Sequence, residues 1–228
     1  METPLSIDVY LATLRQVLNE NGNAEYAQKQ IKYMKNHFDF YGLNAPTWMR
    51  LSKAFFDTHG VFDGEALKDF VRLCFDEPQR ELHYIALEMV QRQLKTQPED
   101  FILFLEELIL TKSWWDSVDW IAKFVAAHFT RFPHQIHPIT EGWISHENRW
   151  LQRMAITFQR YFKHTTDEKM LFDYIQRTAH SKEFFIQKGS GWALREYAKI
   201  NPSAVIAFCE ATELAALTRR EALRRLDV

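Results

Sequence analysis

Apolar residues recur at helical spacing along nearly the whole chain, with short Pro, Gly, Asn or Asp breaks between the segments. The segments are 5–18, 24–34, 46–56, 64–75, 78–94, 98–110, 111–124, 148–162, 167–178, 181–199 and 202–212. No segment shows convincing strand alternation, and seven Gly and seven Pro in 228 residues are few for a turn-rich β fold. The sequence predicts an all-α protein in which eleven or more short helices stack as hairpins over one domain, residues 1–228.

A loose repeat runs through these segments: an aliphatic residue is followed four positions later by a small one. The pairs, at steps of 36, 33 and 35 residues, are Leu82/Ala86, Val118/Ala122, Leu151/Ala155 and Ile186/Ser190, with a degenerate copy, Trp48/Ser52, 34 residues upstream. The period is slightly below the roughly 40 to 47 residues of HEAT and armadillo repeats. It predicts a right-handed solenoid of HEAT-like hairpins in which the small residue allows adjacent helices to approach.

Charge is distributed unevenly. Residues 57–110 contain 12 acidic and 5 basic side chains, whereas residues 145–200 contain 10 basic and 6 acidic ones. Ordinary solvated helix faces account for this asymmetry unless the basic residues converge. The positions just after the aliphatic anchors are His83, Asp119, Gln152 and Gln187, and the next positions in the later repeats are Arg153 and Lys188.

Equivalent positions in a solenoid face the same way. We therefore expect Arg153, Lys188 and Arg195 to lie on the wall of a concave groove that could follow a phosphate backbone.

The stretch TKSWWDSVDWIAKF, residues 111–124, places aspartates among tryptophans. Ser113 and Asp116 have the spacing of a capping box, so we expect a helix to begin near Trp114. Trp115 and Asp119 are then neighbours on one helix face.

Two interpretations of Asp119 remain open from spacing alone. A carboxylate among aromatic rings suits a flat cation. Alternatively, Trp114, Trp115 and Trp120 all belong to the core and Asp119 pairs with a neighbouring arginine.

Four segments resemble a known family: KYMKNHF (32–38), LEELILTKSWWDSVD (105–119), WLQR (150–153) and SKEFFIQKGSGWALREYAKINP (181–202). They are similar to the HEAT-like DNA alkylation repair enzymes, the alkylpurine DNA glycosylases of the AlkD type, over residues 25–225. The TKSWWDSVD and KEFFIQK segments are the most specific. One departure lies at Gly189 and Ser190, where bulkier residues are expected and a looser helix could reposition Trp192.

The resemblance implies roles for individual residues. Trp115, Asp119 and Trp192 match the lesion-facing site, Arg153 and Arg195 match arginines that help to hold DNA near the lesion, and Tyr33 matches a residue that lines the same cleft. With Lys188 from the groove argument, these form the expected catalytic and DNA-binding set.

The implied activity is excision of cationic N3- and N7-alkylated purines from duplex DNA without strand cleavage. Asp119 would stabilise the oxocarbenium-like sugar and orient water. Two alternatives are a protein-binding scaffold and a DNA-structure binder without catalysis. The two tryptophans with Asp119 favour the enzyme.

The remaining features predict no cofactor and no metal. His134 and His137 lack an evident third ligand, and Cys74 and Cys209 have no paired spacing. The start lacks a signal-peptide pattern, and the most apolar run, 101–110, contains Glu106 and Glu107. We expect a cytoplasmic protein without a membrane span that acts as a monomer on alkylated double-stranded DNA.

Overall fold

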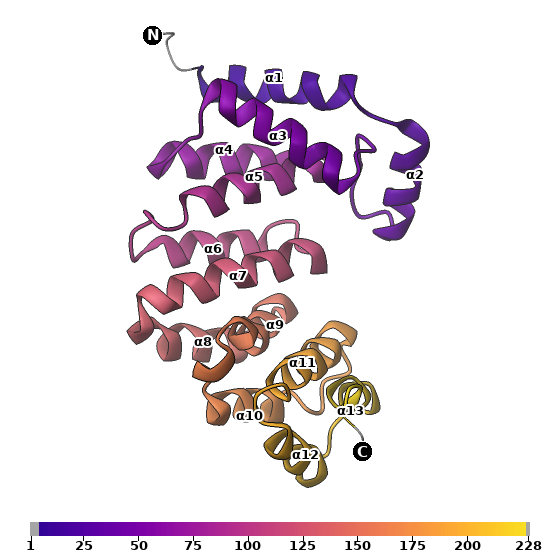
Figure 1. Cartoon of the computed structure of the whole chain (residues 1–228), viewed down its shortest axis with the longest axis vertical. Helices are drawn as coiled ribbons and strands as arrows, with labels where there is room; N and C mark the ends of the chain where they lie inside the picture. The colour runs from indigo at the N-terminus through magenta and orange to yellow at the C-terminus, as the bar shows by residue number, and fades with distance from the viewer. Residues whose placement is uncertain (1–4, 227–228) are drawn as a thin grey trace. The chain divides into compact units, whose positions relative to one another are not determined.

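The computed structural model describes residues 5–226, and these residues form helices and connecting turns without a named β-strand. They divide into two compact units, one ending at Pro98 and the other beginning at Glu99. The expected all-α fold is therefore confirmed (Figure 1). The expected single domain stays a prediction.

The helices of the first unit are α1 (Ile7–Glu20), α2 (Ala24–Tyr33), α3 (Ala45–His59), α4 (Gly64–Asp76) and α5 (Arg80–Gln93). Those of the second unit are α6 (Phe101–Leu110), α7 (Trp115–Arg131), α8 (Ile136–Ile144), α9 (Arg149–Thr157), α10 (Glu168–Arg177), α11 (Phe184–Tyr197), α12 (Pro202–Ala211) and α13 (Ala216–Leu223). Three 3-10 turns complete the second unit: η1 (Pro133–Gln135), η2 (Phe158–Tyr161) and η3 (Lys163–Thr165).

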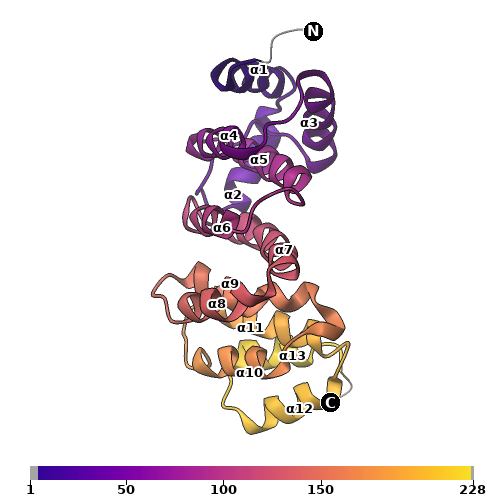
Figure 2. The same cartoon turned by 90° about the vertical axis from the view of Figure 1, so that its left-hand side faces the viewer.

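Each of the eleven periodic segments contains a helix, but the periodicity does not reveal α8 or α13. In α8, Pro138 lies in the first turn, where its missing N–H costs no helical hydrogen bond. In α13, the charged residues of the run RREAL interrupt the apolar pattern by which a helix is predicted. Consecutive helices pack in pairs within each unit, such as α4 with α5 and α8 with α9 (Figure 2).

All five aliphatic-or-Trp/small pairs of the repeat are buried, and they lie on α3, α5, α7, α9 and α11. The core of each unit therefore uses these positions as expected. The residues directly after the aliphatic anchors do not all face the way that the repeat predicts. His83 was expected to face a groove, but it is fully buried, stacks on Phe75 at 4.9 Å between ring centroids and bonds Arg80.

A buried carboxylate holds the connection between α2 and α3. Glu81 is fully buried, and its oxygens accept hydrogen bonds from the backbone N–H groups of Tyr41, Gly42 and Leu43. Burial raises the pKa of Glu81, and the backbone bonds oppose that rise.

In the second unit, α7 packs on α9, α9 on α11 and α11 on α13. This order brings side chains together that are more than 30 residues apart in the sequence. None of the helices within residues 5–226 combines the length and apolar character needed to traverse a membrane.

Candidate functional site

The helix that carries Asp119 begins at Trp115, and its first turn differs from expectation. Its N-cap is Trp114, which makes no side-chain cap bond, and the Ser113 hydroxyl instead donates to the Ile109 carbonyl at 2.6 Å. The expected capping box is therefore wrong, because Ser113 closes the preceding helix α6. Asp116 lies in the first turn of α7, where the positive end of the helix dipole stabilises its negative charge.

The three tryptophans of this segment are each half-buried, so the alternative that placed all of them in the core is wrong. Trp114 packs edge-on against Phe185, with ring centroids 5.1 Å apart, and Phe185 also contacts Trp150 at 4.8 Å. This aromatic cluster joins the start of α7 to α9 and α11.

Asp119 forms a two-pronged ion pair with Arg153. Nε of Arg153 donates to Oδ1 of Asp119 and Nη2 donates to Oδ2, both at 2.9 Å. The pairing of Asp119 with a neighbouring arginine is thus confirmed. The Asp119 side chain is 17% exposed and that of Arg153 only 4%. The arrangement fixes the orientation of the carboxylate, while part of the Asp119 side chain stays exposed.

Arg153 was expected on the wall of a groove, but the structure buries it. Its third donor, Nη1, bonds the Phe185 carbonyl at 2.6 Å. Its hydrogen bonds and its burial leave little guanidinium surface for a phosphate. The position of Arg153 is therefore that of a residue that orients Asp119.

The sequence departure at Gly189 has a direct structural reason. A Cβ at this position would lie 2.9 Å from Nη1 of Arg153. The absence of a side chain at Gly189 thus leaves room on α11 for Arg153, which bonds the Phe185 carbonyl of the same helix. The helix is continuous from Phe184 to Tyr197, so the expected loosening there is not observed.

The other two expected DNA-binding cations share one acidic partner. Lys188 and Arg195 pair with Glu221 of α13, at 2.9 and 2.6 Å. These hydrogen bonds lower the pKa of Glu221. Sequence reasoning missed Glu221 because it stands inside a run of arginines, RREALRR. Contact of Lys188 and Arg195 with DNA stays a prediction.

Trp192 carries a neighbour that the sequence did not reveal. The guanidinium carbon of Arg160 lies 3.2 Å from the centroid of the Trp192 ring. Burial lowers the pKa of Arg160, while the nearby charge of Asp119 raises it. Arg160 thus contacts Trp192 and lies close enough to Asp119 for that charge to affect its pKa. Its spacing of seven residues from Arg153 was the available signal, since such residues share a face in a helix.

Tyr33 is the last residue of α2 in the first unit, and it is 67% exposed. All the other expected site residues, Trp115, Asp119, Arg153, Lys188, Trp192 and Arg195, lie in the second unit. The expectation that Tyr33 lines the same cleft stays a prediction.

A family model and several solved structures match most of the chain. The sequence model of a family described as DNA alkylation repair enzyme matches residues 14–226. A predicted DNA alkylation repair enzyme from Enterococcus faecalis is 30% identical, with a TM-score of 0.84 over 90% of this chain and 97% of that one. No match was found among curated proteins.

Two structures from Streptococcus mutans share the fold at lower identity. One, described as AlkD2, is 15% identical with a TM-score of 0.62 over 89% of this chain and all of that one. The other, smu.31, is 18% identical with a TM-score of 0.59 over 79% of this chain and 98% of that one.

Proposed function

The chain belongs to the DNA alkylation repair enzyme family, and we propose that it is a monofunctional DNA glycosylase for cationic N3- and N7-alkylated purines in duplex DNA. In this proposal it acts as a cytoplasmic monomer without a cofactor. The observation that carries the proposal is the Asp119 carboxylate, which Arg153 fixes by two hydrogen bonds while 17% of the side chain stays exposed.

An alkyl group on N3 or N7 gives the purine a positive charge and makes it a good leaving group. The bond between C1′ and N9 breaks, its electron pair passes to the purine, and the base departs neutral. The sugar gains oxocarbenium character, and water adds its oxygen to C1′ and loses a proton. The enzyme therefore needs to stabilise positive charge on the sugar rather than to protonate the base.

Asp119 meets that need because its carboxylate is oriented before the substrate arrives. A preorganised charge in a partly desolvated site stabilises a transition state more than the same group in water. Arg153 offsets part of the negative charge, but it also prevents the carboxylate from reorienting. The remaining lone pairs of Asp119 can hold the attacking water.

The tryptophans would hold the sugar and the backbone of the damaged nucleotide. Trp115 shares a face of α7 with Asp119. Trp192 has a guanidinium against one face of its ring, so any further contact uses its edge or its opposite face. Lys188 and Arg195 would add contacts to phosphate from α11.

One observation favours a second candidate, a DNA-structure binder without catalysis. The same ion pair that orients Asp119 also satisfies it, as a purely structural pair would. This candidate keeps the affinity for duplex DNA and lacks base release.

The test is incubation with duplexes that carry N7-methylguanine or N3-methyladenine, followed by separation of the released bases. We expect free alkylpurine and a strand that breaks only after alkali, because no amine nucleophile is invoked. Release of neither base, with duplex binding retained, would establish the binding-only candidate.

A further inference from the structure

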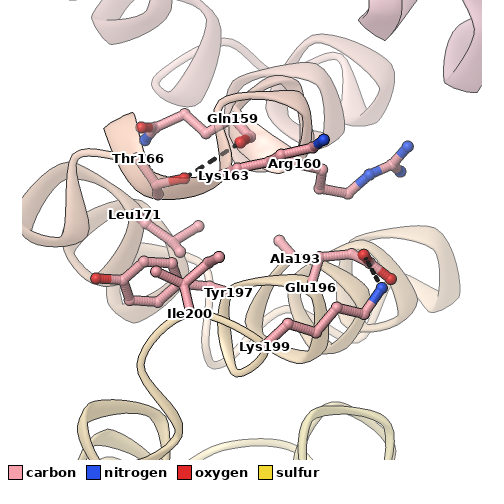
Figure 3. Close-up of a pocket in the computed structure, with 10 residues that line it drawn as sticks. All are labelled: Gln159, Arg160, Lys163, Thr166, Leu171, Ala193, Glu196, Tyr197, Lys199 and Ile200. Atoms are coloured by element: carbon pink, nitrogen blue, oxygen red, sulfur yellow. Dashed lines mark hydrogen bonds and ion pairs between the residues drawn. The ribbon is translucent and has the colours of Figure 1, made fainter.

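A pocket of about 180 Å³ lies beside Trp192, between the turns after α9 and the C-terminal half of α11. Its lining includes the cations Arg160, Lys163 and Lys199 and one carboxylate, Glu196. Figure 3 shows the charged side chains toward one side of this pocket and the Tyr197 ring toward the other. None of these cations belongs to the set expected from the sequence.

The acidic residue of this pocket is already engaged. Burial alone would raise the pKa of Glu196, but hydrogen bonds from Lys199 and Trp192 lower it. Glu196 is therefore ionised and held by its partners. With three cations and one carboxylate, the lining keeps an excess of positive charge.

Arg160 contributes an unused donor. Among the described residues, its Nη1 has no hydrogen-bond partner, and this atom is shielded from solvent. Its Nη2 makes only a long bond of 3.4 Å to the Tyr161 hydroxyl. A shielded guanidinium donor without a partner is costly, and an anionic ligand would satisfy it once the Arg160 side chain turned Nη1 toward the pocket.

The shape of the pocket narrows the class of anion. Leu171, Ala193 and Ile200 give it apolar lining, while the charges lie to one side. A nucleotide unit of a DNA strand has the matching character, because its deoxyribose is largely apolar and its phosphate carries the charge. In the proposed function Trp192 holds the damaged nucleotide, so the contact between Arg160 and Trp192 would place such a unit next to it.

We propose that Arg160 and Lys163, with Lys199 at the rim, form a subsite for one backbone phosphate of the DNA strand beside the lesion. This inference rests on the proposed function, because it takes duplex DNA as the ligand. It adds a contact separate from those proposed for Lys188 and Arg195, which do not line this pocket and which pair with Glu221 on α13. Phosphate contacts position a duplex without reading its sequence.

The first experiment measures binding of an undamaged duplex over a range of salt concentrations. We expect Lys163→Gln to reduce the slope of log affinity against log salt by about 0.9, the contribution of one phosphate. The matched control is Lys169→Gln, which removes an exposed lysine of the same unit that does not line the pocket. Equal slopes for wild type and Lys163→Gln, or equal losses in both variants, would overturn the subsite.

The second experiment neutralises phosphates of the duplex one at a time as methylphosphonates. At one position we expect wild type and Lys169→Gln to lose roughly 10-fold in affinity. Arg160→Gln and Lys163→Gln should lose little at that position, because the contact is already absent. If no position is coupled to Arg160 or Lys163, the inference fails.

Base release is measured on the same proteins so that the two ideas fail separately. If one phosphate is coupled to Arg160 or Lys163 but no base is released, the proposed glycosylase activity is wrong and the subsite stands. If bases are released normally but no phosphate is coupled, the subsite is wrong and the glycosylase activity stands. Binding of inorganic phosphate that depends on Lys163, with no effect on duplex affinity, would show a site for small anions and overturn the DNA assignment.

Discussion

Asp119 combines pairing, partial burial and partial exposure, and each of the three affects its chemistry. Both oxygens accept from Arg153, yet the side chain is 17% exposed. A structural ion pair gains nothing from that exposure, whereas a catalytic carboxylate requires it. Substitutions that separate charge from shape can distinguish these roles.

Asp119→Asn keeps the shape of the side chain and removes its charge. We expect excision of N7-methylguanine under single-turnover conditions to fall on the order of 10²- to 10³-fold, the scale for losing one preorganised electrostatic group. Duplex affinity should change little. Circular dichroism checks that the variant is folded, since Arg153 loses its charged partner.

Asp116→Asn is the matched control on the same helix. Its carboxylate lies in the first turn of α7, so its loss should cost about 0.3 to 1 kcal/mol of stability and leave excision intact. Equal excision by wild type and Asp119→Asn, or a larger loss in Asp116→Asn, would show that Asp119 is not the catalytic carboxylate.

At the scale of elements, two glycines of α11 admit two different neighbours. A Cβ on Gly189 would meet the far end of the flexible Arg153 side chain. A Cβ on Gly191 would lie 2.5 Å from Cβ of Glu221 and 2.7 Å from the Thr218 carbonyl oxygen on α13. One contact can yield by a side-chain shift, and the other requires a helix to move.

The two Gly→Ala substitutions should therefore separate activity from stability. Gly189→Ala should displace Arg153 and lower excision, and the helix propensity of alanine, up to about 1 kcal/mol, should offset only part of the cost of disturbing the buried ion pair. Gly191→Ala should cost about 1 to 3 kcal/mol of unfolding free energy through overpacking. Urea denaturation and single-turnover excision measure both effects. Lowered stability in Gly189→Ala with unchanged excision would contradict this view of Arg153.

The packing of α13 on α11 predicts a dependence on pH. Hydrogen bonds from Lys188 and Arg195 lower the pKa of Glu221 below its usual 4.5. Its ionised form therefore contributes stability above pH 4.5, and that contribution disappears as the pH falls through the lowered value. We expect the difference in Tm between wild type and Glu221→Gln to be large at pH 7 and to shrink below pH 4.5. Glu147→Gln, an exposed carboxylate of the same unit, is the control; a constant difference at every pH would refute the ionic role of Glu221.

At the scale of the whole molecule, the resemblance assigns residues of both units to one DNA site. Tyr33 is 67% exposed, so Tyr33→Ala should leave Tm nearly unchanged. If both units contact one duplex, excision should nevertheless fall. Tyr26→Ala, on the same helix and 40% exposed, is the matched control. Identical excision by both variants and wild type would restrict the site to the second unit.

Much of the fold could be predicted because helical periodicity is local. Eleven segments and the buried pairs from Trp48/Ser52 to Ile186/Ser190 follow from residues within four positions of one another. The helices α8 and α13 escaped because a proline and a run of charge mask their periodicity. The Ser113 cap was misassigned because a hydroxyl can bond backward to a preceding helix as well as forward to the next.

The sequence by itself determined the helical class, the buried helix positions and, through resemblance, the family. Only the tertiary structure decided which partner each charged group meets: Arg153 pairs with Asp119, Glu221 pairs with Lys188 and Arg195, and Arg160 packs on the Trp192 ring. These partners lie between 26 and 34 residues apart on different elements. Local spacing sets the face on which a side chain lies, whereas helix packing sets its distance to a distant partner, and ion pairing depends on that distance.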